Sequence, residues 1–130
     1  MNLITKTAVA MLLIMSVAAA HASNLDKAAN ILDQQAKRGK GEFITYLSGA
    51  AAAYRWVGKD GDPQARGLYC PPADAKFDGR AWGKIALEEY RRDKAQYADL
   101  KEYPLDVFAL ALLHGLKNKY PCPAESATGE

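Results

Sequence analysis

Apolar residues recur at helical spacing along most of the chain, and the alternation of apolar and polar residues that is typical of strands is almost absent. In residues 24–37 the apolar positions follow intervals of four, three and four, at Leu25, Ala29, Leu32 and Ala36. Residues 42–57 carry a second such stripe, made of Phe43, Leu47, Ala50, Tyr54 and Val57. Gly39 and Gly41 separate the two segments and permit a tight reversal. The pattern therefore predicts two amphipathic helices joined by a short turn.

Two more helical segments follow a loop that contains consecutive prolines, which cannot continue a helix. Residues 78–94 have an apolar face, made of Ala81, Trp82, Ile85, Ala86 and Tyr90. A charged stripe at i, i+4 spacing lies on the same segment, at Lys84, Glu88 and Arg92. After a polar connection over residues 95–103, Pro104 fits the first turn of a last helix that runs to about residue 119. That segment is apolar nearly all round, which predicts a central position wrapped by the other helices.

The N-terminal segment has the pattern of a cleavable signal peptide. Lys6 precedes an apolar run from Ala8 to Ala20 without a charged residue, and small residues surround the expected cleavage site before Ser23. The run is too short and too rich in alanine to span a bilayer comfortably. We therefore predict export to the periplasm without membrane insertion, and three parts: a signal peptide of residues 1–22, one helical domain of residues 23–122 and a disordered tail of residues 123–130.

The chain has two cysteines, Cys70 and Cys122, and an even count in an exported protein favours a disulfide over free thiols. Together with the helical segments this predicts an all-α fold: a small bundle of four to five helices, closed by one disulfide and without a sheet. The formal net charge is only +2 at pH 7. Such a balance gives no reason to expect a nucleic acid as partner.

Candidate catalytic and metal-binding residues are few. Once the signal peptide is removed, His114 is the single histidine, and its apolar segment favours a place at the edge of the core. One histidine and two disulfide cysteines cannot supply a tetrahedral zinc site. Asp60 and Asp62 do not continue into a calcium-binding loop, so a solvated turn is expected. Glu88 and Glu89 point about 100° apart on a helix and are interpreted as surface charge. We therefore expect no enzyme activity, no metal and no cofactor.

Three local patterns follow one another with characteristic spacing. They are the segment Tyr46–Ala53 (YLSGAAAA), the segment Tyr69–Pro72 (YCPP) and the segment Lys119–Cys122 (KYPC) at the end of the last helix. Together they resemble the type VI amidase immunity (Tai) and resistance-associated protein immunity family, over about residues 25–122. Many relatives carry a further cysteine pair between the first two helices, whereas this chain has Leu32 and Phe43 in that neighbourhood. The cognate effector therefore stays open.

The resemblance implies a periplasmic immunity protein that binds a type VI secretion effector with peptidoglycan amidase activity and occludes its active site, protecting the producing cell. It also implies a helical bundle, often a homodimer, that contributes no chemistry of its own. In relatives the effector is gripped by the third helix and by the loop before the last helix. In this chain that surface comprises Glu88, Arg91, Arg92, Gln96, Tyr97, Asp99, Lys101 and Glu102.

Two tyrosines, Tyr97 and Tyr103, lie in the polar connection, where burial is not required. Exposed tyrosines are typical anchors of protein interfaces, so Tyr97→Ala is expected to weaken the complex and leave the fold intact. Two other classes of function stay open. One is a small periplasmic stress chaperone that exposes apolar surface on acidification, or another secreted helical binding module; the other is an enzyme that depends on His114.

Overall fold

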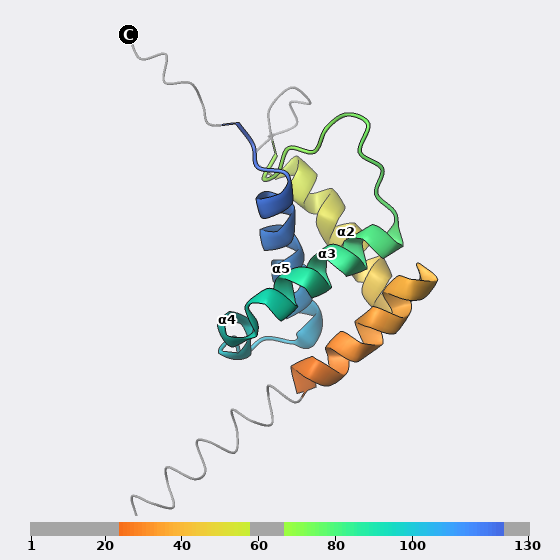
Figure 1. Cartoon of the computed structure of the whole chain (residues 1–130), viewed down its shortest axis with the longest axis vertical. Coiled ribbons are helices and arrows are strands. Elements are labelled where there is room, and N and C mark those ends of the chain that lie inside the picture. The colour runs from red at the N-terminus through yellow and green to blue at the C-terminus, as the bar shows by residue number, and fades with distance from the viewer. Residues whose placement is uncertain (1–23, 58–66, 124–130) are drawn as a thin grey trace, which may run out of the picture.

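The computed structural model describes residues 24–57 and 67–123, which form five helices and no strand (Figure 1). This confirms the predicted all-α bundle of four to five helices. The predicted signal peptide, the turn at Asp60 and Asp62, and all but the first residue of the predicted tail lie outside the described residues. Among the described helices, none has both the length and the apolar character needed to cross a membrane.

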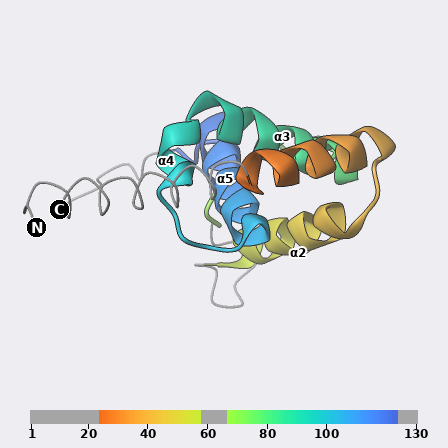
Figure 2. The ribbon, with the colours of Figure 1, turned by 90° about the horizontal axis from the view of Figure 1, so that it is seen from below.

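A helix of residues 24–38 and helix α2 (Glu42–Trp56) form the two arms of a hairpin (Figure 2). The apolar stripe predicted for the first arm is confirmed, because its four members are all buried. The stripe predicted for α2 is right only in part. The helix buries Phe43, Ile44, Leu47 and Ala51. Val57 is 49% exposed, because the backbone leaves the helix after Trp56 and turns Val57 out of the stripe.

The turn of this hairpin depends on two glycines and one glutamine. Gly39 and Gly41 adopt φ values of 71° and 140°, a region that L side chains rarely enter. A Cβ at Gly41 would also lie 2.3 Å from the side chain of Gln35. The buried Oε1 of Gln35 accepts a hydrogen bond from the Phe43 N–H at 2.9 Å. Gln35 therefore satisfies one of the free donors at the start of α2, where no capping side chain is present.

Helices α3 (Gly79–Arg92), α4 (Lys94–Ala98) and α5 (Pro104–Lys119) complete the bundle. The side chain of Asp78 caps α3 by accepting a hydrogen bond from the Ala81 N–H at 2.9 Å. The predicted central position of α5 is confirmed, since it packs on both α3 and α2. Its side chains Phe108, Leu112 and Leu116 are completely buried. The backbones approach closely where α5 crosses α3, because a Cβ at Gly115 would lie 2.7 Å from the Cγ2 of Ile85.

The predicted disulfide is confirmed. Cys70 and Cys122 are bonded with an S–S distance of 2.03 Å and are 52 residues apart in the chain. The Cys70 N–H also donates to the carbonyl of Tyr120 at 2.9 Å. Next to this pair, Phe77 stacks on Trp82 and meets Tyr120 edge-on. The disulfide thus fastens the loop before α3 to the end of α5, and such a bond is typical of proteins exported to an oxidising compartment.

Candidate functional site

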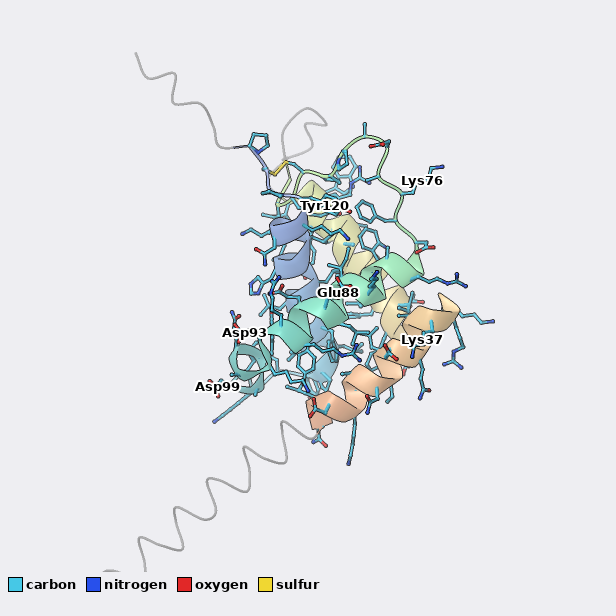
Figure 3. The ribbon with its side chains drawn as sticks, in the orientation of Figure 1. Lys37, Lys76, Glu88, Asp93, Asp99 and Tyr120 are labelled. Carbon is cyan, nitrogen blue, oxygen red and sulfur yellow. A yellow bond between two sulfur atoms is a disulfide. The ribbon has the colours of Figure 1, made fainter. Side chains whose placement is uncertain are left out.

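The binding residues predicted from the sequence lie along the second half of α3, the short helix α4 and the loop before α5; Figure 3 shows Glu88 near the middle of the molecule and Asp99 at its edge. Seven of the eight are exposed, and they are Glu88, Arg91, Arg92, Gln96, Asp99, Lys101 and Glu102. The eighth, Tyr97, is not exposed. The structure therefore leaves seven members of the predicted set exposed and removes one from the surface.

The prediction that Tyr97 is an exposed anchor is wrong, because its exposed fraction is 0%. The segment expected to be a polar connection forms α4, which folds back so that Tyr97 enters the core. Its hydroxyl donates to Oε1 of Glu89 at 3.2 Å and lies 2.9 Å from Nδ1 of His114. Burial, reinforced by the Glu89 carboxylate, raises the pKa of Tyr97 far above its ordinary value. Tyr97 thus fastens α4 to both α3 and α5.

Glu89 is the second surprise of this region, since it was interpreted as surface charge and is only 6% exposed. Its carboxylate accepts hydrogen bonds from the hydroxyl of Tyr97, the guanidinium of Arg92 and, at 3.4 Å, the amide of Asn118. A buried carboxylate is tolerated when donors satisfy its oxygens in this way. The neighbouring Glu88 is exposed, as predicted, and lies 3.8 Å from Lys84. The two adjacent glutamates therefore have different roles.

The cluster of Glu89, Tyr97 and His114 connects α3, α4 and α5. His114 is half-buried at the edge of the core, as expected from its apolar segment. Within the described part of the chain, the hydroxyl of Ser48 donates to a backbone carbonyl at 2.8 Å, and no cysteine is free. Among residues 24–57 and 67–123, no group of three or more His, Cys, Asp or Glu side chains is placed to hold a metal ion.

Arg91 and Arg92 point to opposite sides of α3. Arg91 lies 3.7 Å from Asp33 of the 24–38 helix, whereas Arg92 pairs with Glu89 on the side of α5. A hollow lies on each side of this half of α3. The hollow toward the 24–38 helix has a volume of about 380 Å³, and the hollow toward α5 has a volume of about 280 Å³. Glu88 lines both hollows. The predicted charged stripe is therefore a ridge between two concave surfaces.

A polar clamp ties the start of the 24–38 helix to this end of α3. The carboxylate of Asp26 accepts hydrogen bonds from Tyr90 at 3.0 Å and from Lys94 at 3.1 Å. Lys94 and then Tyr90 lower the pKa of the Asp26 carboxyl. Burial, followed by the hydrogen bond to Asp26, raises the pKa of Tyr90 to about 12. The clamp thus joins three helices, which are the 24–38 helix, α3 and α4.

This environment predicts a loss of stability at alkaline pH. The unfolded chain ionises Tyr90 near pH 10, whereas the folded protein resists ionisation until about pH 12. The contribution of Tyr90 to stability is therefore complete below about pH 10 and is lost as the pH rises toward 12. Between pH 10 and 11 we expect the ionisation of Tyr90 to lower the free energy of unfolding by roughly 1 kcal/mol, as measured by urea unfolding. Tyr90→Phe should lose less over this interval, and an equal loss in both proteins would contradict the assignment.

The loop between α4 and α5 carries the most exposed aromatic side chain of the described residues. Tyr103 is 81% exposed, directly before the proline that begins α5. Its carbonyl accepts hydrogen bonds from the N–H groups of Asp106 and Val107 at 2.9 and 3.1 Å, so the backbone is fixed while the ring projects into solvent. Lys101 and Glu102 flank it and line a shallow hollow of about 350 Å³. Tyr103, and not Tyr97, is the exposed tyrosine of the former polar connection.

Comparison with protein-family models, with curated proteins and with solved structures found no match to this chain.

Proposed function

We propose that this chain is a periplasmic immunity protein. In this proposal it binds a secreted peptidoglycan amidase effector of the type VI secretion system, occludes the effector's active site and protects the producing cell. The three sequence patterns described above support the family, and the disulfide supports an oxidising compartment outside the cytoplasm. The observation that carries the binding role is the fixed loop before α5, which presents Tyr103 at 81% exposure.

The loop is suited to fill a cleft because the residues on either side of it are anchored. On one side Tyr97 is locked to Glu89 and His114, and the Leu100 N–H donates to the Tyr97 carbonyl at 3.2 Å. On the other side Pro104 begins α5. A binding loop that is already ordered loses little conformational entropy when it binds. Inhibition then requires only a complementary shape that excludes substrate, without any reactive group from this chain.

The exposed residues of this region also suit a protein partner. A standard interface covers about 800 Å² on each side, with a few anchor residues near its centre. The exposed residues of α3, of α4 and of the loop are of mixed charge, and Tyr103 is the most exposed aromatic side chain among them. In this proposal Tyr103 is the central anchor, and Gln96, Asp99, Lys101 and Glu102 form the polar surroundings. Glu88, Arg91 and Arg92 extend the surface along α3.

The function is tested by expressing the neighbouring open reading frame in the periplasm with and without this chain. We expect the neighbour to be toxic through lysis, and co-expression of this chain to relieve the toxicity. Mass spectrometry of the protein recovered from the periplasm should show a mature chain that begins near Ser23. A harmless neighbour, or toxicity that this chain does not relieve, would overturn the proposal.

The anchor is tested by Tyr103→Ala, which we expect to weaken the complex with the effector by at least about 1 kcal/mol, the usual threshold for an anchor residue. The ring contacts little of its own protein, so the melting temperature should not change. Isothermal titration calorimetry measures the affinity. Ile31→Ala is the matched control, because it removes an apolar side chain that is 47% exposed on the 24–38 helix, outside the proposed binding surface. Equal affinity of Tyr103→Ala and the unmodified protein would exclude the anchor.

A further inference from the structure

A groove with a basic rim lies between the 24–38 helix and α3, on the far side of α3 from α5. Its volume is about 380 Å³. Lys37, Arg80, Lys84 and Arg91 surround it, against two acidic residues, Asp33 and Glu88. Ala36 and Leu87, which are buried, form its apolar floor. We call this surface the basic groove.

The charges of the basic groove are not balanced within the protein. The carboxylate of Asp33 forms ion pairs with Lys37 at 2.7 Å and with Arg91 at 3.7 Å. Both cations lower the pKa of the Asp33 carboxyl, and the effect of Lys37 is the larger. Lys84 lies 3.8 Å from Glu88. None of the ion pairs among the described residues involves Arg80. Four cations face two carboxylates, so the groove keeps a positive field that attracts anionic groups.

The turn at the end of the 24–38 helix adds to this field. Arg38 and Lys40 are both exposed there. The turn is held against the start of α3, because a Cβ at Gly79 would lie 2.7 Å from the Gly39 carbonyl oxygen. The nearby Asp78 is already engaged as the cap of α3. The basic rim therefore continues from the groove onto the adjoining corner of the molecule.

The basic groove shares Glu88 and Arg91 with the surface proposed to bind the effector, but it contains no residue of the loop before α5. Figure 3 places Lys37 and Lys76 on one side of the molecule and Asp93 and Asp99 on the other, with α3 between them. The loop end has mixed charge, because Asp93, Asp99 and Glu102 are interspersed with Lys94 and Lys101 along the chain. A partner of the basic groove would leave the loop accessible.

We propose that the basic groove is a second docking surface, which binds an extended acidic segment of a protein partner. The groove is concave, with charges on its rim and methyl groups on its floor. This shape fits a segment whose carboxylates reach the rim while an apolar side chain points to the floor, and it fits a flat anionic membrane less well. The proposal does not depend on the proposed function, because Lys37, Arg80 and Lys84 belong to the groove alone and the test changes only Arg80 and Lys84.

The test uses a fluorescein-labelled peptide of repeating Glu-Leu-Glu sequence as probe, with fluorescence anisotropy as the readout. The unmodified protein should bind it, more weakly as salt is added, and should not bind the same peptide with glutamine in place of glutamate. The double variant Arg80→Glu, Lys84→Glu should lower the affinity by about tenfold or more, because it reverses two contacts. The double variant Lys117→Glu, Lys119→Glu makes the same change of net charge on α5 and should alter the affinity by less than about twofold.

Folding is checked for each variant by circular dichroism, and the milder pair Arg80→Gln, Lys84→Gln keeps the test valid if charge reversal unfolds the protein. Vesicles that contain phosphatidylglycerol provide the competing arm. Equal weakening by the groove and α5 variants would overturn the proposal, since only net charge would then matter. Failure of the unmodified protein to bind the acidic peptide, or groove-dependent binding to the vesicles in preference to the peptide, would overturn it as well.

Discussion

Replacing Cys70 and Cys122 by serine is expected to lower the free energy of unfolding by about 4 kcal/mol, because the disulfide closes a loop of 52 residues in the unfolded chain. A loss of this size is a large share of the net stability of a small domain. The bond also joins the loop before α3 to the end of α5, so the aromatic contacts among Phe77, Trp82 and Tyr120 should loosen with it. Urea unfolding followed by circular dichroism measures the change.

The control is the unmodified protein in the presence of a reductant, which should match the double serine variant in stability. Agreement between the two would show that the effect comes from the bond itself and not from the serine side chains. Two titratable thiols in the native, non-reduced protein would contradict the pairing. So would a midpoint of unfolding that does not change on reduction.

Tyr97→Ala is expected to destabilise the protein by about 3–5 kcal/mol, the usual cost of truncating a fully buried aromatic side chain. The variant would also remove one donor from the buried carboxylate of Glu89 and the partner of His114 Nδ1. This outcome reverses the prediction from the sequence, according to which Tyr97→Ala leaves the fold intact. Thermal and urea unfolding measure the loss of stability.

Tyr97→Phe separates the two parts of this effect. It keeps the ring in the core and removes only the hydroxyl, so the expected loss is about 1–3 kcal/mol, the cost of leaving a buried charged group short of one donor. Tyr103→Ala is the matched surface control. Tyr103 is exposed, so this variant should be as stable as the unmodified protein. A Tyr97→Ala variant as stable as the unmodified protein would contradict the burial of this ring.

Tertiary contacts decide which tyrosine of the region before α5 is available for binding a partner. Tyr97 and Tyr103 are six residues apart in the same polar stretch, yet one is buried and the other is 81% exposed. A mutational study guided by the sequence alone would have confused a loss of folding with a loss of binding. The structure therefore changes the test of the immunity proposal from Tyr97 to Tyr103.

The sequence by itself determined the disulfide and four helices, namely the 24–38 helix, α2, α3 and α5, but not α4, which forms in the stretch predicted to be a polar connection. α5 was predicted with both of its ends, because Pro104 begins a helix and Pro121 stops it through the chemistry of the backbone alone. The ends of α2 and α3 were predicted to within about two residues from glycines and apolar periodicity. Two cysteines in an exported chain leave a single possible pairing.

Only the tertiary structure decided which polar side chains are buried. Glu89 and Tyr97 are polar by type, and they enter the core because they satisfy each other together with His114, Arg92 and Asn118. Hydrophobic periodicity predicts burial from the type of each residue alone. It contains no information about hydrogen-bond partners, which for Glu89 and Tyr97 come from three different helices. The same holds for the basic groove, whose rim combines residues of the 24–38 helix with residues of α3. Burial of a polar group depends on its partners, and the partners meet only when the chain has folded.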